Sequence, residues 1–296
     1  MIEYNSIKLE DRDRVNEILL ADPQIGSEYC FGNIYMWGEA YDAKIGFYKD
    51  FFMLKMKEND KPYYSFPVGD GDLKECLDEI KSEAKIKDHG VSFYNVSKKN
   101  LEKLDNLTDC NFKITKNEGQ GDYIYLVSDL INLKGKKYKS KRNHISYFLK
   151  NYDYKYEEIN KDNLEECYQM SLDWNKIHKS NIKEYESKEP EAIKRAYENF
   201  DYLGLVGGLI RSNNKIIAYT FGEKINDYMF CTHVEKAYAD IRGAYPLINQ
   251  QFSEHTINNF EYVNREEDLG IEGLRKAKRS YNPVMLLEKY YAVCDE

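Results

Sequence analysis

The sequence predicts a mixed α/β fold of the α+β kind, in which two domains carry mainly antiparallel sheets flanked by helices. The length of 296 residues suggests about two domains, which we place at 1–133 and 134–296. A hydrophobic content of 42%, without a long polar tract, is typical of a folded globular protein. Short apolar strands alternate with amphipathic helices along the chain, and three strands follow one another directly in the second half.

The first half begins with helices and then alternates. Val15, Ile18 and Leu19 at helical spacing predict a helix over residues 9–20, which Pro23 ends. Asp72 followed by Glu75 forms a capping box that starts another helix, and Ser97 caps a third. The remaining expected elements are an aromatic helix over 27–37 and strands over 45–48, 51–56, 63–67, 91–95, 112–114 and 123–127.

The second half has a clearer order of elements. After a basic run, the pattern predicts strand, helix, helix, three strands, helix, strand, short basic helix and strand. The first of these helices is expected to start at a capping box formed by Asp162 and Glu165. The expected strands cover 154–159, 203–210, 216–221, 228–234 and 260–264, and the longer helices cover 189–200 and 243–257.

The overall charge and the lack of apolar spans limit the function classes. A net charge of -8 argues against a protein that coats nucleic acid over its whole surface, although a local basic patch remains compatible with it. No stretch approaches the roughly 18 to 20 apolar residues of a membrane span, and the first residues do not resemble a signal peptide. We therefore expect a cytoplasmic protein.

The six cysteines are scattered, without a CxxC pair or a histidine at ligand spacing. This arrangement predicts reduced and mostly buried thiols and no metal site.

The densest basic run opens the second half and leads into an amphipathic helix. Such a run attracts phosphate or a nucleic-acid backbone. The alternative is that its charged side chains only lie in solvent at the start of the helix. The candidate contacts with nucleic acid are Lys136, Lys137, Lys139, Lys141 and Arg142.

A second charged segment lies near the C-terminus, where an apolar strand runs into an acidic loop over 264–270 and then into a basic helix. Opposite charges meet there at a strand end, which is where α/β folds tend to build sites. The alternative is a solvated loop whose charges pair locally.

Several motifs of the chain resemble those of an uncharacterised bacterial family. This family is similar to the soluble C-terminal domain of phosphatidylglycerol lysyltransferases and, more distantly, to Fem-type peptidyltransferases. The resemblance implies two tandem domains of the GNAT acyltransferase fold, whose relatives transfer an aminoacyl group from aminoacyl-tRNA to an amine or a lipid hydroxyl. The motifs that carry it are Tyr29–Trp37, Gly135–His144, His233–Ala237, Arg242–Tyr245 and Asn264–Gly270.

The chain departs from these relatives in two respects. The lysyltransferases carry a membrane-spanning portion that this sequence does not show. A lipid acceptor is therefore less expected than a small-molecule or peptide acceptor. Acetyl-CoA enzymes of the fold carry Arg/Gln-x-x-Gly-x-Gly/Ala before the long helix, whereas Ala239–Ala244 contains only one glycine. Because a pyrophosphate cradle needs free backbone N–H groups, we expect aminoacyl-tRNA rather than acetyl-CoA as donor, and no tightly bound cofactor.

Acyl transfer from an activated ester requires a proton acceptor, a positioned nucleophile and donors for the oxyanion. Glu266 and Asp268 are the candidate proton acceptors. The alternative function is a non-catalytic RNA- or nucleotide-binding protein that keeps the same site, and the sequence gives no oligomeric state. The candidates for substrate or phosphate binding are Arg242, Gly243, Asn264, Arg265, Lys276 and Arg279.

Overall fold

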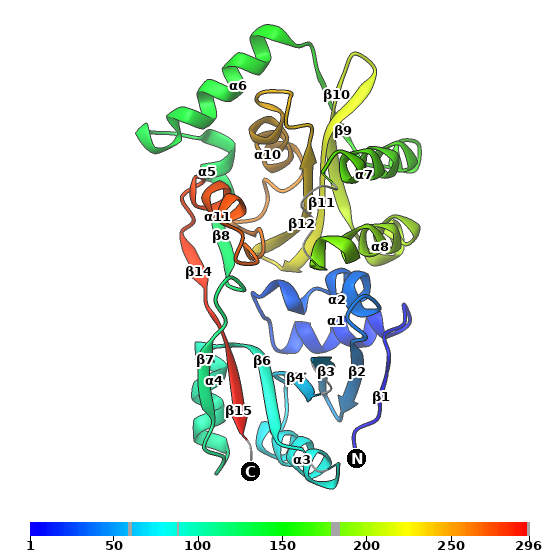
Figure 1. Ribbon diagram of the computed structural model, residues 1–296, viewed down its shortest axis with the longest axis vertical. Helices are drawn as coiled ribbons and strands as arrows, with labels where there is room; N and C mark the ends of the chain where they lie inside the picture. Colours follow the sequence, from blue (N-terminus) through cyan, green and yellow to red (C-terminus); the bar gives the residue numbers. More distant parts are fainter. Residues whose placement is uncertain (59–60, 88, 179–183, 295–296) are drawn as a thin grey trace.

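The computed structural model describes residues 1–58, 61–87, 89–178 and 184–294, which form two sheets flanked by helices (Figure 1). The first sheet has the order β1-β2-β3-β4-β6-β15-β7, with β5 paired to β3, and the second has the order β14-β8-β13-β12-β11-β10-β9. The described strand pairs are antiparallel apart from β4 with β6 and β12 with β13. The predicted mixed fold with mainly antiparallel sheets is confirmed.

The expected elements of the first half are present in the expected order, and the structure adds strands over 4–6 and 68–69 and a helix over 127–132. They are β1 (Tyr4–Ser6), α1 (Asp11–Ala21), η1 (Ser27–Tyr29), α2 (Phe31–Gly38), β2 (Lys44–Tyr48), β3 (Phe51–Glu58), β4 (Lys61–Ser65), β5 (Val68–Gly69), α3 (Leu73–Ile86), β6 (Val91–Ser97), α4 (Lys98–Leu107), β7 (Lys113–Lys116), β8 (Asp122–Leu126) and α5 (Val127–Asn132).

The second half follows its predicted order as well, with two strands where one was expected at the end and with a short helix over 200–203, so that the strand predicted for 203–210 begins at Val206. Its elements are η2 (Lys136–Tyr138), α6 (Lys139–Asn151), β9 (Lys155–Glu158), α7 (Leu164–His178), α8 (Glu184–Glu198), α9 (Phe200–Leu203), β10 (Val206–Ser212), β11 (Lys215–Asn226), β12 (Met229–Ala237), α10 (Ala244–His255), β13 (Tyr262–Asn264), α11 (Glu272–Arg279), β14 (Met285–Leu287) and β15 (Lys289–Cys294).

Helix starts depend on side-chain caps, and two of the three predicted caps are present. The Asp72 carboxylate accepts the Glu75 N–H at 3.0 Å, and the Ser97 hydroxyl accepts the Asn100 N–H at 3.3 Å. The prediction for Asp162 is wrong, because α7 begins at Leu164 after a turn. In that turn the Asn163 side chain accepts the N–H of Asn160 at 2.8 Å.

Two strands belong to the sheet of the other half. β8 lies in the second sheet between β14 and β13, and β15 lies in the first sheet between β6 and β7. Figure 1 shows β8 and β14 continuing into β7 and β15 along one side of the molecule. The division at 133/134 stays a prediction. Each of these two strands lies on one side of it in the sequence and in the sheet of the other half.

The halves also share one hydrophobic core. In Figure 1, α1 and α2 lie between the two sheets. Phe31 and Ile34 of α2 belong to the same buried cluster as Phe200, Phe221 and Val234 of the second half. Because burial of such side chains contributes roughly 1.5–3 kcal/mol each, the packing holds the two halves together.

The expectation that all six cysteines are reduced is wrong for one pair. Cys110 and Cys294 form a disulfide across 184 residues of sequence. The return of β15 to the first sheet brings residue 294 near the segment after α4, and sequence spacing cannot show that approach. The other four cysteines are buried free thiols, as predicted: Cys30, Cys76, Cys167 and Cys231.

No helix in the described part of the chain is long and apolar enough to cross a membrane.

Candidate functional site

The candidate site lies where two parallel strands separate. β12 pairs with β13 only over Met229–Cys231 against Tyr262–Asn264, and β12 then continues to Ala237 without this partner. The carboxyl ends of diverging parallel strands are a common place for ligand binding, because side chains and free backbone groups meet there. The 264–270 loop leaves β13 at this point.

A bulge places His233 at the divergence. Phe221 of β11 pairs with Val234 and Gly222 pairs with Thr232, which leaves His233 as an extra residue on β12. Bulges re-aim side chains in this way and are frequent beside active sites.

His233 lies between two carboxylates. Its Nδ1 atom is 2.8 Å from Glu266 Oε1, and its Nε2 atom is 2.9 Å from Glu223 Oε1. The side chains of His233, Glu223 and Glu266 are 1%, 9% and 19% exposed. Burial lowers the pKa of His233, but the neighbouring Cys231 sulfur and the two carboxylates together raise it well above its usual value. The two carboxylates therefore favour the charged form of the ring.

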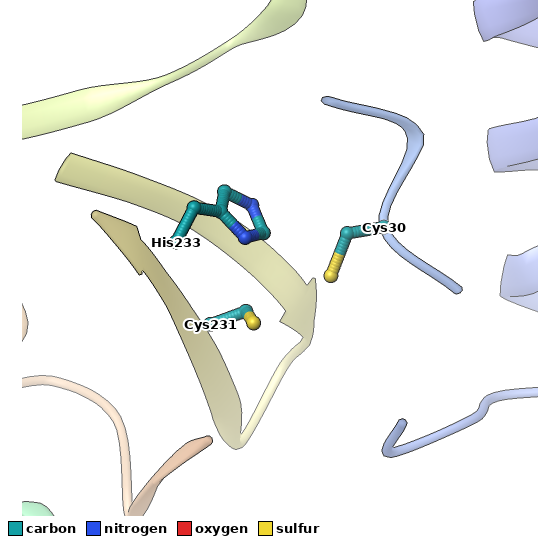
Figure 2. Close-up of side chains that lie close together, drawn as sticks. All are labelled: Cys30, Cys231 and His233. Atoms are coloured by element: carbon teal, nitrogen blue, oxygen red, sulfur yellow. The ribbon is translucent and has the colours of Figure 1, made fainter. Parts of the chain in front are cut away.

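Two buried thiols complete this cluster. Figure 2 shows Cys30, which precedes α2, facing Cys231 and His233 of β12. Burial raises the pKa of Cys30 to about 12, and burial also raises that of Cys231. Neither thiol is a nucleophile in this environment, because reactivity requires the thiolate.

Glu266 has an uncommon backbone conformation. Its φ of +57° lies in the left-handed region, and the Asn264 side chain accepts its N–H at 2.7 Å. The Glu266 carbonyl accepts the N–H of Tyr123 at 3.1 Å. Such conformations cost of order 1–3 kcal/mol and are concentrated at functional sites, so the loop is built to hold this carboxylate.

Asp268, the other candidate proton acceptor, has both oxygens occupied. Its Oδ2 atom accepts from Tyr123 Oη at 2.7 Å and from Arg275 Nε at 2.8 Å. Its Oδ1 atom accepts from Gly270 N at 2.9 Å and from Arg275 at 3.0 Å. These four hydrogen bonds fix the 264–270 loop to α11 and β8, and the geometry therefore favours Glu266 as the proton acceptor.

Arg265 spans the opening between the strands. Its Nη2 atom lies 2.8 Å from Glu235 Oε1 of β12, and its guanidinium lies 4.8 Å from the centre of the Tyr281 ring. Its Nη1 atom is buried and has no hydrogen-bond partner among the residues that the structure describes. A buried and unpaired guanidinium nitrogen is costly, so this atom is a candidate donor for a substrate oxygen.

One lysine of the basic run reaches the same place. Lys141 Nζ lies 3.6 Å from the centre of the Tyr281 ring. Burial, together with the nearby charge of Arg265, lowers the pKa of Lys141 to about 8. Lys141 and Arg265, predicted from separate motifs, therefore share one aromatic side chain.

The rest of the basic run lies on the surface. Lys136 and Lys139 are exposed, and Lys137 pairs with Asp129 at 3.1 Å. Arg142 instead donates to the carbonyls of Leu133 and Gly135, which gives it a role in holding the segment before α6.

Arg242 and Gly243 lie at the start of α10 and contact α6. Arg242 Nε lies 3.4 Å from His144 Nδ1, and its guanidinium stacks 4.4 Å from the centre of the Tyr147 ring. Gly243 has a φ of +97°, and a Cβ there would lie 2.4 Å from the His144 carbonyl oxygen. The close approach of α6 therefore explains this glycine without a bound phosphate.

Asn264 belongs to a buried polar cluster between the two sheets. Its side-chain amide donates to Asp122 at 2.8 Å, and Asp122 lies 2.6 Å from Lys289 Nζ of β15. Lys289 also pairs with Glu28 at 2.7 Å. These contacts give Asn264 a structural role at the junction of the halves.

The two predicted cations of α11 are exposed. Lys276 pairs with Glu272 within the helix, and Arg279 lies on the surface. Lys278 of this helix is half-buried instead; it donates to the Arg265 carbonyl, and desolvation lowers its pKa.

Sequence reasoning missed several members of the site. Glu267 was counted only as a loop charge, although burial and the charge of Glu266 raise its pKa to about 7. Cys231 and His233 stand two residues apart on a strand, which is a usable local signal. Cys30 and Glu223 have no such signal, because only the packing of the two halves brings them to His233.

A hollow of about 750 Å³ lies on the surface beside the turn that precedes α10. Its lining includes Asp173 and Lys176 of α7 and the segment Tyr238–Ile241, and does not include Glu266.

Comparisons with known proteins agree with this architecture. The family model described as phosphatidylglycerol lysyltransferase, C-terminal, matches residues 23–293. A conserved protein of unknown function from Bacteroides thetaiotaomicron is 40% identical, with a TM-score of 0.94 and 100% of both chains covered.

Two further structures share the fold. The C-terminal domain of a protein assigned as a lysylphosphatidylglycerol synthetase from Agrobacterium fabrum is 18% identical, with a TM-score of 0.72 over 96% of this chain and 91% of that one. A tandem GNAT protein from the clavulanic acid biosynthesis pathway is 7% identical, with a TM-score of 0.53 over 100% of this chain and 98% of that one. The predicted tandem GNAT-like fold and the family resemblance are confirmed.

Proposed function

The chain belongs to the family of phosphatidylglycerol lysyltransferase C-terminal domains, and from this membership we propose that it transfers an aminoacyl group from aminoacyl-tRNA to an amine or hydroxyl acceptor. The family and the fold make it an acyltransferase-like protein. The observation that carries the proposal is the Glu266 carboxylate, held by His233 at the divergence of β12 and β13.

In this reaction Glu266 accepts a proton from the attacking amine or hydroxyl. The acyl–oxygen bond of the tRNA ester breaks, a new amide or ester bond forms, and the released tRNA hydroxyl takes up a proton. His233 orients the Glu266 carboxylate, and Glu223 in turn orients His233 from the other side. Because the ester is already activated, positioning and proton transfer are sufficient, and no covalent enzyme intermediate is needed.

The buried guanidinium of Arg265 supports the binding of an oxygen-rich group. Its Nη1 atom and the Lys141 ammonium provide positive charge around the Tyr281 ring, and Arg265 directly precedes Glu266 in the chain. We assign to Arg265 and Lys141 the binding of carbonyl or phosphate oxygens at the aminoacyl end of the donor tRNA.

The start of α10 supports aminoacyl-tRNA over acetyl-CoA as donor. The backbone of α6 approaches Gly243 closely, and Arg242 stacks on Tyr147 of α6. A pyrophosphate would need free N–H groups at this helix start, which α6 crowds. The exposed Lys136 and Lys139 would contact the tRNA backbone. The proposed reaction takes place in the cytoplasm and needs no tightly bound cofactor.

The test is a transfer assay with charged tRNA. The full chain is incubated with tRNA carrying labelled amino acids and with amines, peptides and phosphatidylglycerol vesicles as separate acceptors. We expect acceptor-dependent release of the label from tRNA, which Glu266→Gln reduces and Glu272→Gln, an exposed control, does not. Equal release by the wild type and Glu266→Gln would contradict the assigned role.

A second candidate function is binding of RNA or a nucleotide without transfer. It is favoured by the exposed Lys136 and Lys139 of the basic run, which would contact a phosphate backbone whether or not transfer follows. Thermal stabilisation by uncharged tRNA, together with no labelled product from any acceptor, would support this alternative.

A further inference from the structure

The inference concerns the buried thiols and imidazole at the junction of the halves. The Sγ atoms of Cys30 and Cys231 and a ring nitrogen of His233 all lie within 4.8 Å of one another. Cys30 is 2% exposed, Cys231 is 0% exposed, and the His233 side chain is 1% exposed. Figure 2 shows the imidazole directed toward the two sulfurs, which come from opposite halves of the chain.

A carboxylate stands beside two of these three. Glu266 Oε1 lies 2.8 Å from His233 Nδ1 and 3.8 Å from Cys231 Sγ. Nδ1 is therefore the ring nitrogen on the side of the sulfur and the carboxylate.

The other ring nitrogen has the partner that a metal-bound histidine requires. A histidine that binds a metal through one nitrogen usually donates its other N–H to a carboxylate or carbonyl. His233 Nε2 lies 2.9 Å from Glu223 Oε1, and the same oxygen accepts the Asn33 N–H at 3.0 Å. Glu223 is thus fixed where it would hold the ring for metal binding through Nδ1.

We propose that Cys30, Cys231 and His233 bind Zn²⁺, with the Glu266 carboxylate as the fourth ligand. Two sulfurs, one imidazole and one oxygen are a donor set that suits tetrahedral zinc. With Zn–S bonds of about 2.3 Å, sulfurs in a tetrahedral site lie about 3.8 Å apart, so side-chain shifts of about 1 Å close the cluster around the ion.

The burial of this donor set also favours a metal. A thiol is a weak hydrogen-bond donor and a weak acceptor. Two buried thiols that face each other and an imidazole therefore satisfy little of the hydrogen-bonding capacity of the cluster. A divalent cation would compensate the charge of the two thiolates and the carboxylate at the position they surround. Bound there, it would cross-link Cys30 of the first half to β12 and the 264–270 loop of the second.

This proposal does not rest on the transfer reaction. Zinc and the acceptor would compete for Glu266, so the transfer assay is run with a metal chelator present. A failure of transfer in the presence of the chelator then counts against the proposed transfer reaction, and an absence of bound zinc counts against the zinc site.

The test is the metal content of the full chain, purified without a histidine tag and in the absence of oxygen. We expect about one zinc ion per chain in the wild type after dialysis against zinc and then buffer. Cys231→Ser should lower the retained zinc tenfold or more. Cys76→Ser, which changes a free cysteine that is equally buried but lies in the core of the first half, should retain it.

A spectroscopic measurement covers the case in which Cys231→Ser does not fold. Chelator-treated wild type is titrated with Co²⁺, and we expect sulfur-to-cobalt charge-transfer absorption that saturates at one equivalent and is displaced by Zn²⁺. Wild type that retains no zinc, lacks this absorption, or contains a Cys30–Cys231 disulfide under these conditions would overturn the proposal.

Discussion

Glu266 Oε1 and His233 Nδ1 lie 2.8 Å apart, although His233 lies on β12 and Glu266 follows β13, its parallel partner. The contact joins β12 to the 264–270 loop at the point where the strands separate. It makes the position of a carboxylate in the site depend on a buried imidazole.

Replacing Glu266 with Gln should reduce transfer by about 100-fold or more, because Gln keeps the shape of the side chain but does not accept the proton. The free energy of unfolding should fall by about 1–3 kcal/mol, since the buried His233 ring loses one of the two carboxylates that contact it. Single-turnover transfer and urea unfolding of the same preparations measure both effects. Full transfer activity of this variant would exclude Glu266 as the proton acceptor.

Lys141 should make stability depend on alkaline pH. Its pKa is about 8 in the folded protein and 10.5 in its usual state, so the unfolded chain binds the extra proton between these values. Stability should therefore rise from about pH 8 toward pH 10.5, with the penalty for burying the charge fully present below pH 8. Urea unfolding of the wild type and Lys141→Met at several pH values checks this; parallel pH profiles of the two proteins would contradict it.

Breaking the buried pair of Asp122 and Lys289 should be strongly destabilising. Asp122→Ala removes one of the carboxylates that pair with the Lys289 ammonium, which is 2% exposed and also pairs with Glu28. We expect a loss of about 3–5 kcal/mol in the free energy of unfolding, as for other buried pairs. The exposed pair of Lys276 and Glu272 is the matched control, and Lys276→Ala should cost less than about 1 kcal/mol.

The exposed lysines of the basic run should contribute to RNA affinity through phosphate contacts. Changing Lys136 and Lys139 to Ala should lower the slope of the logarithm of affinity against the logarithm of salt concentration by about one for each lysine. Fluorescence anisotropy with labelled tRNA measures this slope. An unchanged slope would show that these lysines do not contact the backbone.

The disulfide should stabilise the oxidised protein. Reduction of Cys110–Cys294 should lower the free energy of unfolding by about 2–5 kcal/mol, and Cys110→Ser should remove the effect of the reductant. Disulfides are rare in reducing compartments, so the proposed cytoplasmic location predicts free thiols at both positions in protein extracted from cells under thiol-trapping conditions.

Local sequence patterns predicted the local structure. The caps at Asp72 and Ser97, the strand pair of β2 and β3, and the order of elements from β9 to α11 depend on residues close in sequence. Asp162 is not the cap because the side chains of Asn163 and Asn160 form the turn, where they accept the N–H groups of Asn160 and Asp162. The partner of β15 lies on β6, which is nearly 200 residues away, and no local pattern reports such a distant pairing.

The candidate site was predictable only in part. The 264–270 loop and Lys141 were selected from their charges, and the structure brings Arg265 and Lys141 to the same ring. Charge alone could not separate Glu266 from Asp268, because the difference lies in the four hydrogen bonds that occupy Asp268. The prediction for Arg242 depends on its position just before a helix. That position does not indicate that its guanidinium stacks on the Tyr147 ring of α6.

The strand exchanged into the first sheet affects how the chain folds during its synthesis. β7 pairs only with β15 among the described strands, and β15 is made about 170 residues later. At 5–20 residues per second, the ribosome needs on the order of ten seconds to reach it, and for that time β7 and β6 expose unpaired edges. A nascent chain of this protein therefore presents two open strand edges to chaperones and to other nascent chains until its last strand emerges.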